Sequence, residues 1–217
     1  MTTMTPTFET AISNRGLIAI LRGVRPHEAV DIGKALVDAG IGVIEVPLNS
    51  PEPLASIEKL ATALSGEAVI GAGTVLDVES VAAIAQAGAS LALSPDCNLD
   101  VVRAAKAAGL TAMPGVATAT EALAALRAGA DALKLFPARE IGAGVIGAWS
   151  AVLPRRAPIF AVGGVDEANF ESFLRAGAAG FGLGSSLYRP GATLAEVAAA
   201  ATRAVAAWDR LTLEIAA

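Results

Sequence analysis

The sequence predicts an α/β protein that folds as one closed (β/α)8 TIM barrel, and three observations lead to this fold class. The 217 residues favour one domain over two. A unit of about 23 residues recurs, in which a helix-like stretch ends at a glycine and an apolar segment of strand length follows. Eight apolar segments alternate in this way with amphipathic stretches, which is typical of parallel strands joined by helices.

The predicted helices end at glycines, and the predicted strands lie between the helices. Glycine accepts the left-handed backbone conformation that ends many helices, because it has no side chain to clash there. The glycines of this kind, each preceded by alanine or serine, are Gly40, Gly66, Gly88, Gly109, Gly129 and Gly177. The apolar segments predict strands at residues 17–21, 43–46, 69–72, 91–93, 110–113, 132–136, 159–162 and 180–183.

The starts of the predicted helices carry capping residues, whose side chains accept hydrogen bonds from unpaired backbone N–H groups. These starts are Ser50 before Pro51, Thr118 with Glu121, Asp166 before Glu167, and Thr193 with Glu196. No break in composition interrupts the series, so a closed barrel is favoured over the alternative, an open doubly wound sheet. We expect one domain over residues 1–217, with residues 1–16 as an N-terminal helical extension.

Composition and charge restrict the function classes. The chain has 16 Lys and Arg against 21 Asp and Glu, a formal net charge of −5, which argues against binding to a nucleic acid backbone. No uninterrupted apolar run reaches about 18 residues, so no membrane span is expected. Cys97 and His27 are the only residues of their kinds, which excludes an internal disulfide and a zinc site of several histidines. Residues 1–10 lack the pattern of a secretory signal, and we expect a cytoplasmic location.

Two charged residues lie on predicted strands and are expected to point into the barrel. Side chains along a strand alternate between the barrel interior and the helix layer. Glu45 shares the parity of Val43, and Lys134 shares that of Ala132 and Phe136. Because active sites of such barrels form at the C-terminal ends of the strands, Glu45 and Lys134 are the first candidates for chemistry.

Lys134 is the candidate nucleophile. An ammonium group between Leu133 and Leu135 on a central strand is desolvated, which favours the neutral amine and lowers its pKa. A neutral amine attacks a carbonyl carbon, the first step of Schiff-base catalysis, and Glu45 would supply and accept protons in later steps. The alternative is a structural ion pair between Lys134 and Glu45, although burying such a pair gains little stability.

Further polar and glycine residues follow other strands at the same end. Arg22 is placed to bind a carboxylate through its planar guanidinium, and Thr74 offers a hydroxyl. The last two strands end in glycine-rich stretches, whose backbone N–H groups can approach a phosphate. The residues concerned there are Gly163, Gly164, Gly184 and Ser185. Gly71 and Gly73 on the third strand are expected to relieve crowding below the site.

Five stretches carry a family resemblance. They are IAILRG at 18–23, IEVPLNS at 44–50, IGAGTV at 70–75, ALKLFP at 132–137 and AVGGV at 161–165. Together they resemble the class I aldolases that act on 2-keto-3-deoxy-6-phospho sugar acids, and the resemblance extends from Ile18 to Trp208. Asn49 and the Ala161-Val162 pair are more similar to the galactonate branch of the family than to the gluconate branch.

The resemblance implies a homotrimeric (β/α)8 barrel that needs no metal and cleaves a phosphorylated keto acid to pyruvate and glyceraldehyde 3-phosphate, as in galactonate catabolism. Lys134 matches the family's Schiff-base lysine and Glu45 its proton shuttle. The positions that match substrate-binding residues are Arg22, Thr74, Gly164, Gly184 and Ser185, and those that line the pyruvate pocket are Pro95 and Phe136. Residues 138–141 depart from the family's usual small residues, which makes Arg139 a candidate for an additional phosphate contact.

Alternatives of other specificity and class remain at this point. Within the family they are a gluconate-type aldolase and a 4-hydroxy-2-oxoglutarate aldolase. Outside it, a phosphate-binding barrel isomerase or epimerase shares the glycine-rich strand ends. A sugar-phosphate sensor without turnover is the non-enzymatic option.

Overall fold

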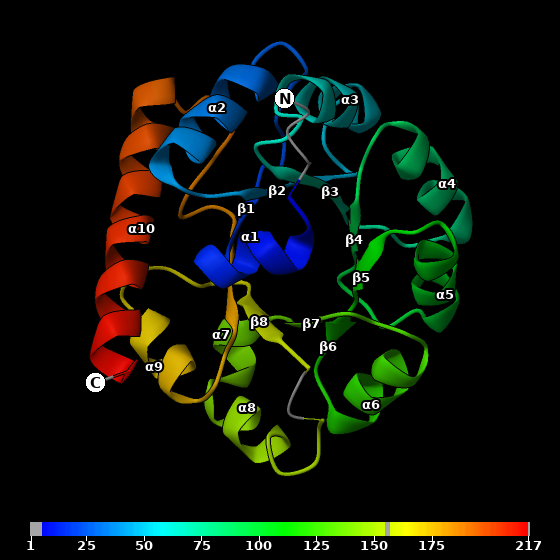
Figure 1. The fold of residues 1–217 in the computed structure, drawn as a ribbon, viewed down its shortest axis with the longest axis vertical. Helices are drawn as coiled ribbons and strands as arrows, with labels where there is room; N and C mark the ends of the chain where they lie inside the picture. The colour runs from blue at the N-terminus through cyan, green and yellow to red at the C-terminus, as the bar shows by residue number, and fades with distance from the viewer. Residues whose placement is uncertain (1–5, 155–156, 217) are drawn as a thin grey trace.

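The structure is a computed structural model that describes residues 6–154 and 157–216. Its centre is one parallel sheet, wrapped into a barrel and surrounded by helices (Figure 1). The strand segments are β1 Leu17–Ile20, β2 Val43–Pro47, β3 Val69–Gly73, β4 Leu91–Leu93, β5 Thr111–Met113, β6 Gly115–Val116, β7 Leu133–Leu135, β8 Ile159–Val162 and β9 Gly180–Leu183. The α/β barrel predicted from the sequence is confirmed.

The barrel closes on a single stretch of chain, residues 111–116. The strand order runs from β5 through β4, β3, β2, β1, β9, β8 and β7 to β6, so the two ends of the sheet are neighbours on either side of Pro114. The backbone N–H of Lys134 donates to the carbonyl of Pro114 at 2.9 Å, and that of Asp131 donates to Ala112 at 3.0 Å. The strand predicted at residues 110–113 is thus seen as β5, and a further segment, β6, follows it beyond Pro114, because proline has no N–H to continue the hydrogen-bond ladder.

The helices form a ring around the sheet, except for α1, which lies across one end of the barrel (Figure 1). They are α1 Phe8–Asn14, α2 Ala29–Ala39, α3 Pro53–Ala63, α4 Val78–Gln86, α5 Leu99–Ala107, α6 Ala119–Arg127, α7 Ala138–Ile141, α8 Gly144–Trp149, α9 Phe170–Arg175 and α10 Leu194–Ala216. The glycines predicted to end helices all adopt positive φ, as at Gly40 with 99°. No helix in the described ranges is long and apolar enough to cross a membrane.

Two of the predicted helix starts are confirmed. The Thr118 hydroxyl accepts from the Glu121 N–H at 3.2 Å, and the Glu121 carboxylate accepts from the Thr118 N–H at 2.9 Å. Thr193 and Glu196 exchange the same two hydrogen bonds at the start of α10. Both are capping boxes, which satisfy two unpaired helical N–H groups reciprocally.

The other two predicted helix starts are wrong. The third helix begins at Pro53 rather than Pro51, because the Ser50 hydroxyl accepts from the Gly23 N–H at 3.0 Å in the loop after β1. The ninth begins at Phe170, because Asp166 caps a turn in front of it, with its Oδ1 accepting from the Ala168 N–H at 3.1 Å. In both cases a proline or an acidic residue marks a turn that precedes the helix by a few residues.

Alternate residues of each strand face a separate apolar core inside the barrel. This interior includes Val43 and Ala132, with Phe136 packed against it, whereas the neighbours of these residues on the strands, such as Ile44 and Leu133, belong to the core between strands and helices. The parity predicted for Glu45 and Lys134 follows this pattern. At the end where the strands begin, Phe8 of α1 packs against Phe160 with ring centroids 5.8 Å apart. The C-terminal ends of the strands form the open mouth.

Candidate active site

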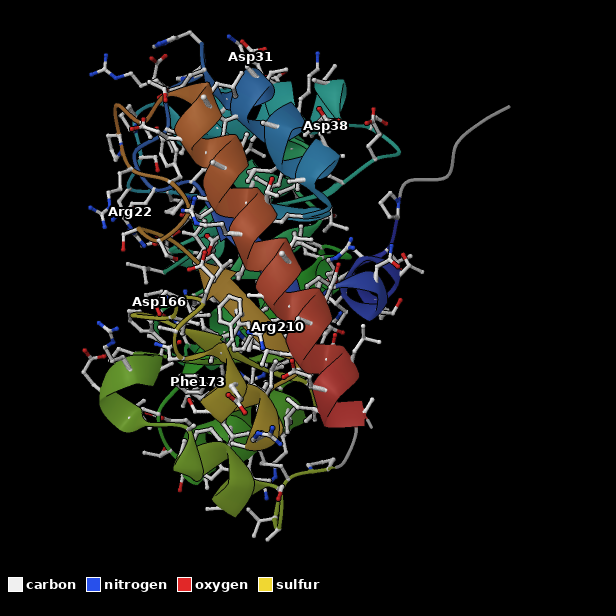
Figure 2. The ribbon with its side chains drawn as sticks, turned by 90° about the vertical axis from the view of Figure 1, so that its left-hand side faces the viewer. Arg22, Asp31, Asp38, Asp166, Phe173 and Arg210 are labelled. Atoms are coloured by element: carbon white, nitrogen blue, oxygen red, sulfur yellow. The ribbon has the colours of Figure 1, made fainter. Side chains whose placement is uncertain are left out.

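A cavity of about 340 Å³ lies at the mouth of the barrel, a size suited to a small metabolite. Two residues that line this cavity, Arg22 and Asp166, lie at the left edge of the molecule in Figure 2, on the side opposite α1. Most of the predicted site residues line this cavity, namely Arg22, Lys134, Phe136, Gly163, Gly164, Gly184 and Ser185. The fold thus brings together residues from the ends of β1, β7, β8 and β9.

Lys134 is a buried amine beside the cavity. Its exposed fraction is 5%, and its Nζ lies 5.1 Å from the centroid of the Phe136 ring. Burial lowers the pKa of Lys134, attraction to Glu45 partly opposes this effect, and repulsion from Arg22 adds to the lowering. The environment therefore favours the neutral, nucleophilic form of the amine.

Glu45 is buried on β2, where it faces the barrel interior. Its exposed fraction is 1%, and its Oε2 has no hydrogen-bond partner among the described residues. Burial raises the pKa of the Glu45 carboxyl, and the charges of Lys134 and Arg22 offset only part of that rise. A buried acceptor without a partner is costly, and a protonated carboxyl in this position is a ready proton donor.

The alternative of a structural ion pair is not seen. Within the part of the chain that the structure describes, the salt bridges do not join Lys134 to Glu45 within 4.0 Å. Burial moves the pKa of the amine down and the pKa of the acid up. Both groups are accordingly driven toward their uncharged forms, an amine that can attack and an acid that can donate.

Gly73 makes room for the Glu45 carboxyl. A Cβ built on Gly73 would overlap the Glu45 Oε2, because β2 and β3 are paired with Pro47 opposite Gly73. The expectation that Gly73 relieves crowding is confirmed. Gly71 has the same effect two residues earlier on β3, where an added Cβ would lie 3.0 Å from the Leu91 Cβ.

Replacing Gly73 by alanine is expected to displace the Glu45 carboxyl and reduce kcat by about 10–100-fold, as a misplaced proton-transfer group loses much of its contribution. Steady-state kinetics measure the effect. Gly144→Ala is the control for an added methyl, since Gly144 is exposed and no atom lies within 4 Å of a Cβ there. A Gly73→Ala variant with unchanged kcat and KM would show that the position of the carboxyl is immaterial.

Arg22 is held by a residue whose role the sequence did not suggest. Its Nη1 donates to the Asn49 Oδ1 at 2.6 Å. Asn49 follows β2 as Arg22 follows β1, and the pairing of these strands places Ile20 opposite Glu45. Their positions after adjacent strands were the signal available in the sequence. The amide fixes one edge of the guanidinium and leaves its other N–H groups for a ligand.

Glu45, Thr74 and Pro95 do not contribute to the lining of the cavity. Thr74 follows β3 with a left-handed φ of 58°, an uncommon conformation for a β-branched residue. Pro95 follows β4, and its carbonyl lies so close to Gly115 that any larger residue at 115 would clash. Both are half-buried at the mouth end of their strands. The structure thus places them near the mouth and away from the cavity surface.

The ends of β8 and β9 form one wall of the cavity. Gly163 and Gly164 have φ of 96° and 70°, conformations that open their backbone to a ligand. The Ser186 hydroxyl donates to the Val165 carbonyl at 3.1 Å, which joins the two loops. Sequence reasoning missed Asp166 as a lining residue and Arg189 altogether, because neither lies within the glycine motifs.

Comparisons with known proteins agree with this arrangement. A family model described as "KDPG and KHG aldolase" matches residues 8–202. The chain is 48% identical over 195 residues to the probable 2-dehydro-3-deoxy-6-phosphogalactonate aldolase of Rhizobium meliloti (strain 1021), covering 90% of this chain and 92% of the relative. It is 47% identical over 192 residues to the 2-dehydro-3-deoxy-6-phosphogalactonate aldolase of Escherichia coli (strain K12), covering 88% and 94%.

Solved structures give the same picture. A structure described as native KDPGal superposes with a TM-score of 0.89 at 46% identity, covering 91% of this chain and 96% of that one. A KDPG aldolase from Legionella pneumophila, with pyruvate captured as a covalent carbinolamine, superposes with a TM-score of 0.82 at 26% identity, covering 90% and 96%. The protein described here therefore belongs to the KDPG and KHG aldolase family.

Proposed function

We propose that this protein is a class I aldolase that cleaves 2-dehydro-3-deoxy-6-phosphogalactonate to pyruvate and D-glyceraldehyde 3-phosphate. The observation that carries the proposal is the buried amine of Lys134, with its pKa lowered by burial, at a cavity on the mouth of the barrel. The galactonate specificity is supported by the two relatives of that name at 47% and 48% identity.

In the proposed reaction, the neutral Lys134 Nζ attacks the C2 carbonyl carbon of the substrate, and a proton passes from the nitrogen through water to the oxygen, which becomes a hydroxyl. Glu45 gives its proton to this hydroxyl, which leaves as water and forms an iminium ion. The Glu45 carboxylate then takes the proton of the C4 hydroxyl, directly or through a water molecule. The C3–C4 bond breaks, its electron pair neutralises the iminium as an enamine, and the aldehyde is released.

The second half of the proposed reaction restores the enzyme. Glu45 returns its proton to C3 of the enamine, which becomes an iminium again. Water adds to C2, the C–N bond breaks, and pyruvate leaves with the amine and the carboxylic acid restored. Every proton moved in the cycle therefore passes through Glu45 or water, and the iminium on Lys134 is the acceptor of the electron pair.

The rest of the proposed site holds the two ends of the substrate. Arg22 binds the carboxylate through the N–H groups that Asn49 does not use. The backbone of Gly163, Gly164 and Gly184, with Ser185, binds the phosphate. Phe136, which packs beside the Lys134 amine, lines the pyruvate end of the cavity.

The proposed assembly follows the family resemblance: a homotrimer of one-domain chains in the cytoplasm. A phosphorylated acid does not cross a bilayer unaided, because transfer of its charges into hydrocarbon is too costly. Sedimentation equilibrium of the full chain is expected to give three times the mass of one chain. A monomer at micromolar concentration would contradict the trimer.

Cleavage of the two C4 epimers tests the proposed substrate. We expect kcat/KM for the galactonate compound to exceed that for the gluconate compound at least about 10-fold, a difference that one well-placed hydrogen bond supplies. Pyruvate release is followed with lactate dehydrogenase, and the rate is expected to be unchanged by EDTA. A preference for the gluconate epimer would overturn the specificity, and absence of pyruvate release would favour an isomerase or a sensor.

A further inference from the structure

Arg139 and Asp166 form an ion pair on the wall of the cavity that neither the mechanism nor the family motifs use. The Arg139 Nη2 lies 3.6 Å from the Asp166 Oδ2, and the side chains are 60% and 36% exposed. Both residues line the cavity beside Gly163 and Gly164. An exposed pair at this distance contributes little stability, so the guanidinium can leave Asp166 for a better partner.

The backbone and aliphatic part of Arg139 are fixed, whereas its guanidinium is held only by the exposed ion pair with Asp166. The Arg139 N–H donates to the Gly163 carbonyl at 3.0 Å. A Cβ built on Gly164 would lie 2.7 Å from the Arg139 Cβ and 2.9 Å from its Cδ. The side chain therefore runs directly over the glycine turn, and its guanidinium stands where the turn opens to the cavity.

The charge balance of this wall calls for a mobile cation. The Asp166 carboxylate lines the same cavity, and without a counter-charge it would repel a bound phosphate. Arg189 also lines this wall, where its Nε donates to the Ser185 carbonyl at 2.9 Å and anchors the guanidinium beside that residue. Arg139 brings a planar set of N–H donors, and its contact with Asp166, at 3.6 Å, is longer than a hydrogen bond.

We propose that Arg139 is a specificity-determining residue for the phosphate end of the substrate. Its guanidinium rests on Asp166 in the free enzyme and transfers to the phosphate oxygens when the substrate binds, so that a side-chain cation reinforces the backbone N–H groups of the glycine turn. This inference rests on the proposed aldolase function. It adds a residue that makes the enzyme discriminate phosphorylated from unphosphorylated aldehydes.

The test uses the full-length enzyme in the condensation direction, with pyruvate and either D-glyceraldehyde 3-phosphate or D-glyceraldehyde. For Arg139→Gln, kcat/KM with the phosphorylated aldehyde is expected to fall about 10–100-fold, through KM, as for loss of a charge-assisted hydrogen bond. With the unphosphorylated aldehyde it is expected to change less than about twofold. Arg139→Lys is expected to restore part of the loss, because it keeps the charge without the planar donors.

Arg203→Gln is the matched control. Arg203 lies 3.8 Å from Glu167, and the two side chains are 64% and 33% exposed, so the same change removes an ion pair of the same kind close by. Arg203 is not among the lining residues of the cavity. Discrimination between the two aldehydes is expected to stay at the wild-type ratio in this variant.

Asp166→Asn provides a second, independent variant. The asparagine keeps an acceptor for the Ala168 N–H but removes the charge that competes for Arg139. Inhibition by inorganic phosphate is expected to become about 2–10-fold tighter, as expected when a nearby like charge is removed from an anion site. Weaker inhibition by phosphate in this variant would overturn the proposal.

The remaining outcomes separate this inference from the proposed function. An equal loss with both aldehydes in Arg139→Gln would overturn the inference in favour of a structural role, and no loss with either would mean that the remaining groups hold the phosphate. In both cases reduction with borohydride in the presence of pyruvate still labels Lys134, and the aldolase function stands. If the wild type neither reacts with pyruvate nor distinguishes the aldehydes, both proposals fall.

Discussion

Lys134→Met is expected to lower kcat for pyruvate release by about 10³-fold or more, because no other amine can take the place of a covalent nucleophile. Borohydride with labelled pyruvate is expected to modify one peptide in the wild type, the one that contains Lys134, and none in the variant. Mass spectrometry of a digest measures both. Labelling that persists in Lys134→Met would assign the Schiff base to another lysine.

Lys34→Met is the matched control for this substitution. Lys34 is an exposed residue on α2, and we expect this variant to keep both the label on Lys134 and the wild-type rate.

Lys134→Met is also expected to be more stable than the wild type at neutral pH. The folded-state pKa of Lys134 is lowered, so between the folded and the unfolded pKa the unfolded chain binds more protons than the folded chain, and stability rises with pH up to the unfolded pKa. Methionine avoids this penalty, and we expect a gain of about 1 kcal/mol or more at pH 7. Urea unfolding should show the gain narrowing as the pH approaches 10, and a variant destabilised at pH 7 would contradict this account.

Glu45→Gln is expected to reduce kcat by about 10²–10⁴-fold, the range that a positioned general acid or base contributes. Glutamine fills the same space, so the loss would come from proton transfer and not from packing. Glu58→Gln, at an exposed position on α3, is the control with unchanged kinetics.

The pH profile of kcat/KM distinguishes the two residues. Burial raises the pKa of Glu45, so the acid keeps its proton to a higher pH than an ordinary carboxyl, and we expect activity to fall as the pH rises through that pKa. The lowered pKa of Lys134 makes activity fall as the pH drops through it. Glu45→Gln should remove the alkaline limb and leave the acid limb, whereas an unchanged profile would exclude Glu45 as the proton donor.

The strand parity of Glu45 and Lys134 could be predicted from the sequence because it depends on local geometry alone. Side chains alternate along any strand, and the apolar neighbours Ile44 and Leu133 identify the face that packs on the helices. The start of α3 was misplaced for the opposite reason. Ser50 carries a good capping side chain, but that side chain is engaged by Gly23 from another loop, a contact that no local pattern contains.

The same limit applies to the candidate site. The glycine turn at Gly163 is visible as a motif, whereas the contacts made across it are not. Arg139 meets Asp166 only because β7 and β8 are neighbours and their loops extend over the same mouth. The sequence marks each residue as polar and close to a strand end, and the tertiary fold decides which of them face one another.

The aromatic packing at the base of the barrel has a consequence for the order of events. Phe8 and Phe160 fill the interior where the strands begin. Substrate and products therefore enter and leave through the mouth, where the phosphate end of the substrate binds in the proposed site. In the proposed reaction the three-carbon fragment attached to Lys134 lies deeper than the aldehyde. The aldehyde must therefore leave first, so product release is ordered because the barrel has one open end.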